Sequence, residues 1–282
     1  MIAKKELKSL YVERRFGEVE RLLRKDHALL PETKVLFGEG DADSVTALLQ
    51  VVGRVGFDYP NEALPLADTI IGLMGNTDPF VRMDAAQAFA TLFAQDRASA
   101  VRGMPALHGL LDDANPLVRG DAAQAIGNIG FYSPDLVERE AGRLLVILDE
   151  GDDDDEREAV AHSLGKIGAT NPELLKEIFP RLVRALEKTR EASCGGILLA
   201  FGTAGLHYPD LVRKYIPKLI DYLQAENEDT VRYAVLAIGN IASSHPELVA
   251  EAAPYLERVA EFADPDLRVN ARMALSMLKP GS

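Results

Sequence analysis

The side chains of this 282-residue sequence that could perform chemistry are few and scattered. Its one cysteine, Cys194, has Arg190 four residues before it but no histidine nearby. A nucleophilic thiol needs a base and a group that orients that base, so we expect Cys194 to be buried and inert. The sequence contains no phosphate-binding loop and no dinucleotide fingerprint. These patterns predict no catalytic residue and no bound cofactor.

One acidic run stands out, DEGDDDDE at residues 149–156, with seven acids in eight residues. Carboxylates are hard oxygen ligands that suit Ca²⁺, but the run lacks the alternating ligand order of a calcium-binding loop. Blocks of like charge are usually solvated and mobile. We therefore interpret the run as a solvated loop, with contact to a basic partner and a specific cation site as the alternatives.

Composition narrows the class of protein. Apolar residues make up 47% and charged residues 27% of the chain, which is typical of globular proteins. The net charge of −13 argues against nucleic acid as a partner. No apolar run approaches the ~18 residues that span a bilayer, and the first residues lack the apolar core of a secretion signal. With one cysteine and no internal disulfide, we predict a cytoplasmic protein without a membrane partner.

The elements that would carry any site repeat along the chain. A small anchor residue recurs at spacings of 37, 37, 38, 37, 37 and 37 residues, namely Gly53, Ala90, Gly127, Gly165, Gly202, Gly239 and Ser276. Positions five, two and one before each anchor, and two after it, are apolar except at Ser163. This spacing predicts one helix per repeat with a buried stripe, which a neighbouring helix approaches closely at the small anchor.

The other half of each period also predicts helix. One series of prolines falls at the first helical position, where no hydrogen bond is lost: Pro60, Pro134, Pro172, Pro209 and Pro246. A second series falls inside the same helices and predicts a kink in each: Pro105, Pro180, Pro217 and Pro254. Paired helices without β-period segments describe an α-solenoid.

At this point the chain resembles the HEAT-repeat family. The resemblance lies in Pro105, Asp113 and Val118-Arg119, and again in Val81-Arg82. It implies an all-α, right-handed α-solenoid (superhelix) of about seven antiparallel helix pairs with HEAT-like repeats of 37–38 residues. The Asp–Arg ladder of such folds is expected to be interrupted in the fourth repeat, which keeps only Arg157, and in the fifth, with Ser193-Cys194 at the Val-Arg position.

Two segments depart from the regular repeat. Residues 1–37 are predicted to form an N-terminal helical cap or degenerate repeat, and residues 38–282 a single continuous solenoid domain. The fourth and fifth repeats combine the acidic run with Gly195-Gly196, and each helical glycine costs ~1 kcal/mol relative to alanine. We therefore predict a weak joint at residues 149–156 and 188–196.

The enzymes with HEAT-like folds do not match this chain. Metal hydroxylases of this kind carry repeated His-Glu dipeptides, whereas glutamate follows none of the five histidines here. We therefore predict no metal site. The HEAT-like glycosylases need a basic concave face to hold DNA, which this acidic chain does not offer. Nothing here matches the catalysis of HEAT-like bilin lyases.

The exposed side of the anchor helices is the remaining candidate site, and the resemblance places it on the concave side of the solenoid. Positions seven and three before each anchor, and one after it, lie opposite the buried stripe. Their amides would offer an adaptable hydrogen-bonding floor, or they form an ordinary solvated helix face. The predicted partner-binding residues are Gln50, Arg54, Gln87, Gln124, Asn128, His162, Lys166, Leu199, Tyr233, Leu236, Asn240 and Met273.

This face changes character along the chain. Leu199, Leu236 and Met273 share one repeat position, with Val269 and Met277 close by. The final helix is then predicted to be apolar on nearly every side, and such a helix is normally buried against something. The candidates are a homodimer through the C-terminal repeat, a groove for an apolar helix or peptide, and side chains that complete the core.

Taken together, the sequence predicts a non-enzymatic protein–protein interaction scaffold that binds a protein or peptide partner along the concave face of a HEAT-repeat solenoid. The first alternative is a HEAT-like lyase or enzyme subunit. A nucleic-acid-binding HEAT-like protein is a less favoured alternative, because the chain is acidic and contains no tryptophan.

Overall fold

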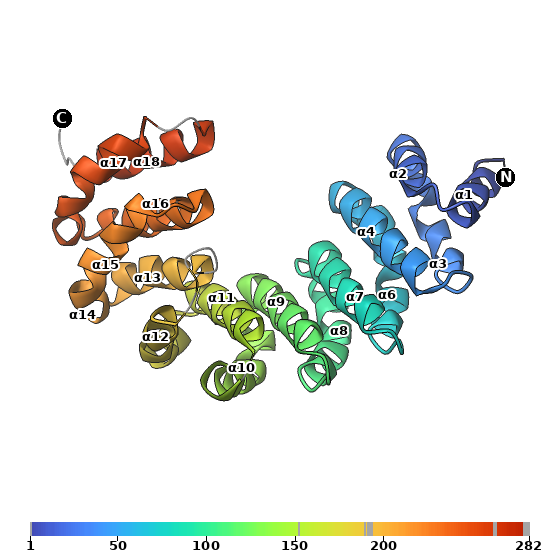
Figure 1. The fold of residues 1–282 in the computed structure, drawn as a ribbon, viewed down its shortest axis with the longest axis horizontal. Helices are drawn as coiled ribbons and strands as arrows, with labels where there is room; N and C mark the ends of the chain where they lie inside the picture. The colour runs from blue at the N-terminus through green and yellow to red at the C-terminus, as the bar shows by residue number, and fades with distance from the viewer. Residues whose placement is uncertain (1, 152, 189, 191–193, 262–263, 279–282) are drawn as a thin grey trace. The chain divides into compact units, whose positions relative to one another are not determined.

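The computed structural model describes residues 2–151, 153–188, 190, 194–261 and 264–278. Within these ranges the secondary structure is helical, with no strand. The chain divides into two compact units, residues 1–140 and 141–282 (Figure 1). No helix in the described ranges has the length and apolarity needed to cross a membrane.

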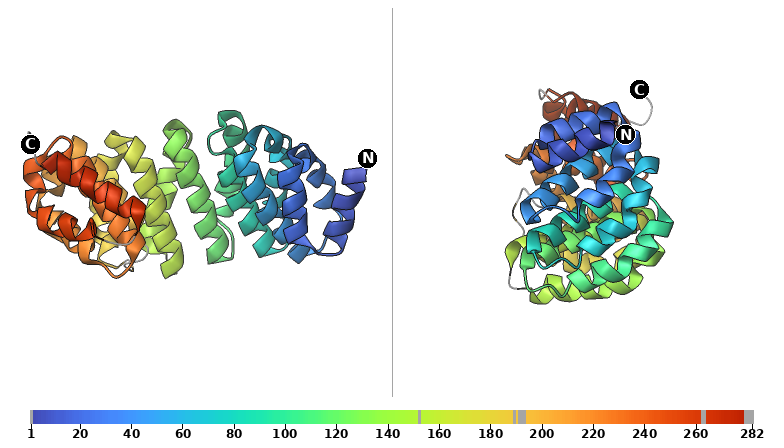
Figure 2. Two further views of the ribbon diagram at one scale, coloured as in Figure 1. Left: turned by 90° about the horizontal axis from the view of Figure 1, so that it is seen from above. Right: turned by 90° about the vertical axis from the view of Figure 1, so that its right-hand side faces the viewer.

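Unit 1 is a series of paired helices. Its anchor helices α4 (Ala42–Asp58), α7 (Pro79–Phe93) and α9 (Pro116–Tyr132) lie side by side in one row (Figures 1 and 2). At the N-terminus, α2 packs against α4 in the same way. The remaining elements are α1 (Ile2–Val12), α2 (Phe16–Lys25), η1 (His27–Glu32), α3 (Thr33–Leu36), α5 (Pro60–Ala63), η2 (Leu64–Leu66), α6 (Ala67–Leu73), α8 (Arg97–Leu110) and η3 (Pro134–Leu136).

Unit 2 repeats the scheme. Its anchor helices α11 (Asp154–Thr170), α13 (Gly195–His207), α16 (Glu228–Ala242) and α18 (Pro265–Leu278) pack in order as a second row. The other elements are α10 (Glu138–Glu150), α12 (Pro172–Leu186), α14 (Pro209–Val212), η5 (Arg213–Tyr215), α15 (Ile216–Asp221), η6 (Tyr222–Gln224), η7 (Pro246–Leu248), η8 (Ala250–Ala252) and α17 (Ala253–Val259). The fold class is therefore the predicted all-α solenoid of helix pairs.

The core follows the predicted stripe. All four stripe positions are buried in each of the first six repeats. Its one polar member, Ser163, is buried as well, and its hydroxyl donates to the Ala159 carbonyl at 2.7 Å. In the last repeat Ala271 and Ala274 are buried, whereas Leu275 and Leu278 are half-buried.

The anchor helices begin at a capping residue twelve positions before the anchor. There the side chains of Asp41, Asp78, Asn115, Asp153, Asn227 and Asp264 each accept a backbone N–H of the first turn. Helix α13 is the exception, because Arg190 occupies that position. This helix begins at Gly195 after Cys194, whose side chain makes no cap hydrogen bond.

The predicted kinks appear in part. Short 3₁₀ turns interrupt the first helix directly before Ile216-Pro217 and Ala253-Pro254. Pro105 and Pro180 instead lie inside the continuous helices α8 and α12, where the predicted kink stays a prediction.

The contacts of the predicted Asp–Arg ladder are present in part. Arg82 donates to both carboxylate oxygens of Asp113, at 2.7 and 2.8 Å. It also donates to the Asn76 carbonyl six residues earlier, and Arg157 repeats that contact with the Gly151 carbonyl at 2.6 Å. The fourth repeat keeps this carbonyl contact, but Arg157 pairs with Asp154 of its own repeat rather than with an aspartate of the next, so the Asp–Arg ladder is interrupted there as predicted. Ser193, expected at the break in the fifth repeat, lies outside the described residues.

Candidate partner-binding faces

The twelve predicted partner-binding residues all lie on anchor helices and divide between the two units. We call the outward side of α4, α7 and α9 the unit 1 face, which carries Gln50, Arg54, Gln87, Gln124 and Asn128. We call the outward side of α11, α13, α16 and α18 the unit 2 face, which carries His162, Lys166, Leu199, Tyr233, Leu236, Asn240 and Met273. All twelve side chains are exposed or half-buried.

A groove of ≈ 510 Å³ opens on the unit 1 face between α2, α4 and α7. Three predicted residues line it, Gln50, Arg54 and Gln87. Its other lining residues are Arg24, Leu49, Gly53, Phe57, Asp58, Asp84, Ala88 and Thr91. Gln124 and Asn128 lie on α9, one helix beyond the residues that form the groove.

The two cations of this groove are already neutralised. Arg54 donates to Glu20 with Nε and Nη2, at 3.1 and 2.8 Å. Arg24 lies between Glu20, at 3.0 Å, and Asp58, at 2.7 Å. The hydrogen bond from Arg54 is the main reason that the pKa of Glu20 falls below its usual value. These four side chains form a balanced charge network at one end of the groove.

Two acids of the unit 1 face were missed by the sequence prediction. Asp84 lies in the groove, is only 5% exposed, and accepts a 3.1 Å hydrogen bond from the Gln50 amide. Burial raises its pKa. Asp121 lies one helix further along, and burial, followed by repulsion from Asp84, raises its pKa to about 6. The signal was an aspartate six residues before the anchor in two successive repeats, at a position flanking the buried stripe.

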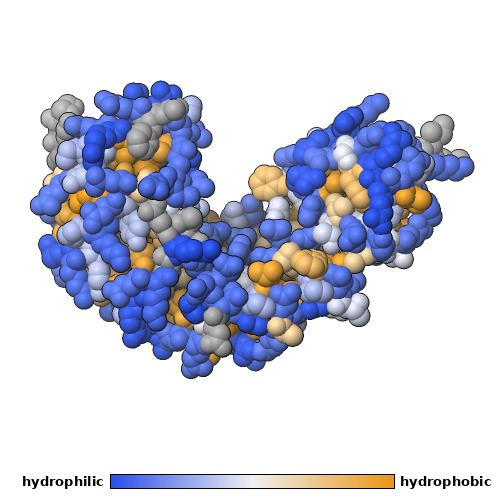
Figure 3. All heavy atoms as spheres, viewed as in Figure 1, coloured by the Kyte–Doolittle hydropathy of each residue, from blue (hydrophilic) through white to orange (hydrophobic). Residues whose placement is uncertain are grey.

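The unit 2 face is apolar at its α16–α18 end. Leu236 is 36% exposed, Met273 54%, Val269 55% and Met277 37%, while Leu199 and Tyr233 are half-buried. Figure 3 shows hydrophobic residues at the surface over α16 and α18, within a mostly hydrophilic surround. The structure thus brings together the apolar residues that share one repeat position, and they stay on the surface rather than completing the core.

The final helix is not apolar on nearly every side, and that prediction is wrong. Val231 and Val235 of α16 are buried, and α18 packs against α16. One repeat later the same positions hold Arg268 and Arg272, and Ser276 replaces Gly239. The apolar character of α18 is therefore confined to the core side and the unit 2 face.

At its other end the unit 2 face carries His162 and Lys166. Burial, and then the charge of Lys166, lower the pKa of His162 to about 4, so the imidazole is neutral at pH 7. Burial also lowers the pKa of Lys166. The His162 ring meets the Tyr233 ring edge-on, with centroids 6.3 Å apart. The predicted polar and apolar parts of this face are therefore in direct contact.

Gly195 and Gly196 belong to the predicted weak joint, which stays a prediction, and they are closely packed. They open α13 and are buried. A Cβ atom at Gly196 would overlap the backbone of His162, and one at Gly165 would overlap the carbonyl of Gly196. The backbones of α11 and α13 therefore touch, and the glycines are required for close packing. Residues 189 and 191–193 of the predicted joint lie outside the described residues.

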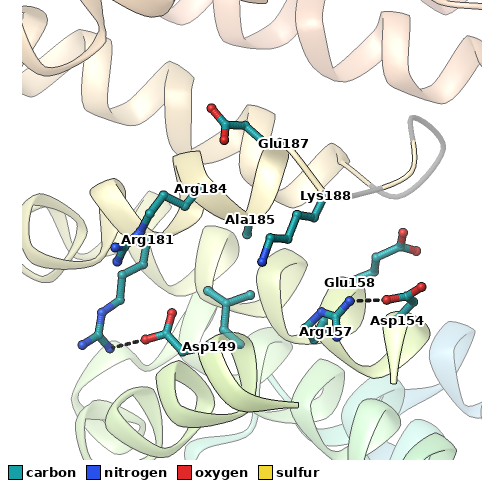
Figure 4. Close-up of a pocket in the computed structure, with 10 residues that line it drawn as sticks. Asp149, Asp154, Arg157, Glu158, Arg181, Arg184, Ala185, Glu187 and Lys188 are labelled. Carbon is teal, nitrogen blue, oxygen red and sulfur yellow. Dashed lines mark hydrogen bonds and ion pairs between the residues drawn. The ribbon is translucent and has the colours of Figure 1, made fainter. Parts of the chain in front are cut away.

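Acids of the run such as Asp154 and Asp155 are exposed to solvent, as interpreted, but its described members also make specific contacts. Asp149 pairs with Arg181 at 3.5 Å, Asp153 caps α11, and Asp155 pairs with Arg190. Figure 4 shows Asp149–Arg181 and Asp154–Arg157 across an adjoining cavity of ≈ 390 Å³. Acids in the first turn also suit the positive end of the helix dipole. In the described part of the chain no three metal-ligating side chains converge, and Asp152 lies outside it.

Comparison with known proteins identifies the fold. No family model and no curated protein matches the sequence. An engineered protein is similar at 22% identity and a TM-score of 0.58, over 76% of this chain and 99% of its own. UNC-45 from Drosophila melanogaster is similar at 14% identity and a TM-score of 0.62, over 93% of this chain and 41% of its own. A chain of the AP-3 complex is similar at 15% identity and a TM-score of 0.56, over 93% of this chain and 45% of its own.

The chain has a HEAT-like helical-repeat fold. The engineered protein and UNC-45 share its helical-repeat architecture. At these sequence identities, the similarity shows the fold alone. This HEAT-like fold agrees with the resemblance that Val81-Arg82 and Val118-Arg119 carry in the sequence. The helices of such folds stack so that one side of each anchor helix stays open, and here those open sides are the two faces described above.

Proposed function

We propose that this HEAT-like protein is a non-enzymatic interaction scaffold that binds protein partners on the faces of its anchor helices. The observation that carries the proposal is the apolar row Leu236, Met273, Val269 and Met277, which stays exposed although the edge of α18 is polar. Exposed apolar residues that continue across neighbouring helices mark interaction sites in soluble proteins. Met and Tyr are enriched in surfaces that adapt to a partner.

The row fits one apolar segment of a partner better than a second copy of this chain. A stable protein interface buries about 800 Å² on each side. Each of the four side chains supplies less than the roughly 150 Å² of a buried aromatic, or under about 600 Å² together. Neighbouring helices lie 8–10 Å apart, which matches the i, i+7 spacing of an amphipathic helix that crosses them.

The test replaces the centre of the row with charge. Leu236→Glu combined with Met273→Glu should leave helicity and Tm unchanged, because both side chains are exposed. Proteins captured by the wild-type chain from cells of its source, and identified by mass spectrometry, should be lost from this variant. The matched control is Val146→Glu on α10, an equally exposed valine of the same unit that lies off the face.

Two outcomes would contradict the proposal. If the double variant captures the same proteins as wild type, the row is not a binding surface. If it unfolds while Val146→Glu does not, the row belongs to the core. Analytical ultracentrifugation adds the homodimer test, because a wild-type dimer that the double variant converts to monomer would identify a second copy as the occupant. The single buried Cys194 suits a reducing compartment, and we place this function in the cytoplasm.

A further inference from the structure

We infer that the groove of the unit 1 face binds a lysine or arginine side chain from a segment of the partner, with Asp84 as the main contact and Asp121 as the second. This inference rests on the proposed scaffold function and specifies the chemistry of the partner at one face. Its starting point is the distribution of charge over the anchor helices α4, α7 and α9.

Asp84 in the groove and Asp121 on the neighbouring helix α9 carry negative charge that no described basic residue of unit 1 pairs with. Arg24 and Arg54, the two cations of the groove, are taken up by Glu20 and Asp58. Asp84 has a single donor, the neutral amide of Gln50. Among the described residues none pairs with Asp121 or donates to it, and the charge of Asp84 repels its own. A side chain that brings a positive charge to this place is complementary to the face.

A cation would also relieve an unfavourable arrangement. Burying a carboxylate is costly unless it is paired, and two such acids in mutual repulsion add to that cost. The raised pKa of each acid reflects the same physical cause. An ammonium or guanidinium group donates strong, charge-assisted hydrogen bonds to carboxylates. Its binding would therefore offset both the cost of burying the carboxylates and their mutual repulsion.

The surroundings of Asp84 suit a long basic side chain. Gln87 is exposed in the groove one repeat after Gln50, so its amide oxygen can accept a further N–H of the guest. Phe57, 64% exposed at the rim, offers an aromatic surface for the aliphatic stem or for a cation–π contact. A basic side chain that enters the groove toward Asp84 would therefore pass groups that it can contact.

A metal ion fits less well. Ca²⁺ takes six to eight oxygen ligands, and sites for it draw on several carboxylates. In the described ranges no group of three potential ligands is assembled, here or elsewhere. The groove offers one carboxylate without a basic partner, Asp84, together with the amides of Gln50 and Gln87, while Asp121 lies on the neighbouring helix α9. This arrangement favours a donor group that forms directed hydrogen bonds.

The experiment uses a minimal probe, the peptide acetyl-Leu-Arg-Leu-amide, with acetyl-Leu-citrulline-Leu-amide as its neutral counterpart. Binding to the full-length protein is followed by NMR amide shifts at 150 mM salt, which screens non-specific attraction to the acidic chain. We expect shifts centred on α4 and α7, at least tenfold weaker binding of the citrulline peptide, and at least tenfold weaker binding of the arginine peptide to Asp84→Asn. Asp121→Asn should weaken binding severalfold.

The control variant is Glu6→Gln, which removes one exposed negative charge of the same unit away from the groove and should bind like wild type. Both asparagine variants should keep or raise Tm, since each removes a desolvated charge, so loss of folding cannot mimic loss of binding. Equal binding of the two peptides, or equal binding by wild type and Asp84→Asn, would overturn the inference. Displacement of the arginine peptide by 5 mM CaCl₂, but not by matched ionic strength, would assign the acids to a metal ion instead.

Failure here is distinguishable from failure of the scaffold proposal. The variant Leu236→Glu with Met273→Glu changes only the unit 2 face and should bind the arginine peptide as wild type does. If the peptide does not bind but proteins are still captured through the unit 2 face, only the assignment of a basic guest is lost.

Discussion

The two faces of this protein occupy the same repeat positions but present opposite chemistry. Three residues before the anchor, the unit 1 face carries Gln50 and Gln87, whereas the unit 2 face carries Leu236 and Met273. The stripe positions beneath them are apolar except at Ser163, and they are buried in both units apart from the half-buried Leu275 and Leu278. The difference shows that the stripe specifies the fold, while the positions that packing leaves open are free to specify a partner.

The units also differ in how closely their anchor helices approach. In unit 1, a Cβ atom at Gly53 would lie 4.0 Å from the Ala88 side chain, which is an ordinary contact. In unit 2, a Cβ atom at Gly165 or Gly196 would overlap backbone. The glycine anchors therefore differ in weight: Gly53, and Gly239 in unit 2, are interchangeable with another small residue, whereas Gly165 is required, as is Gly196 opposite it.

The largest expected effect comes from a substitution that tests this difference in helix packing. Gly196→Ala should destabilise unit 2 by about 2–4 kcal/mol, because the added methyl group meets backbone that cannot move aside. Urea denaturation measures the change. The matched control is Gly142→Ala on α10, where a Cβ atom meets nothing within 4 Å, and which should stabilise by up to about 1 kcal/mol through a better helix propensity. Similar stabilities of the two variants would disprove the backbone contact.

A smaller effect distinguishes the two units by the pH dependence of their stability. The pKa of His162 is about 4 in the fold and near 6.5 when unfolded, so unit 2 should lose stability as pH falls below about 6.5, by roughly 2 kcal/mol at pH 5. The pKa of Asp121 is raised to about 6 from 3.8, so unit 1 carries a penalty at pH 7 that is relieved on acidification. That relief is about 1 kcal/mol by pH 5, after discounting for solvent screening.

The measurement is residue-resolved amide exchange at pH 7 and pH 5, corrected for the intrinsic rate. Protection should fall in α11 and α13 and hold or rise in α7 and α9. His162→Gln should remove the loss, and Asp121→Asn should remove the gain. Parallel changes in both units, or changes that survive these substitutions, would contradict the assigned pKa values.

Most of the fold could be predicted because one simple rule generates it. A stripe with 37–38-residue spacing identifies the anchor helices, and caps such as Asp78 and Asn115 fix where they begin. The sequence is less informative where a residue type has two structural uses. Gly196 weakens an isolated helix, but here it permits backbone contact, which propensity alone cannot reveal. Likewise the acids of 149–156 repel one another in sequence but find Arg181 and Arg190 in space.

The candidate site could be predicted as a set of outward positions, but not as a charge pattern. Helical periodicity places Gln87 and Met273 on the surface correctly. It could not show that Arg54 is neutralised by Glu20, 34 residues earlier, or that Asp84 is left without a cation. Those facts depend on contacts between successive repeats. The polar edge of α18 was also missed, because only packing distinguishes its covered side from its open side.

The most direct test of the central claim, that partners bind the open sides of the anchor helices, is site-specific photo-crosslinking in cells of the source. A benzoylphenylalanine replaces Gln87 or Met273 on the two faces, and, as controls, Val101 or Val146, which are equally exposed on the first helices α8 and α10. The account predicts discrete adducts with other proteins from Gln87 and Met273, and none from Val101 and Val146. Adducts from the two valine positions alone would contradict it.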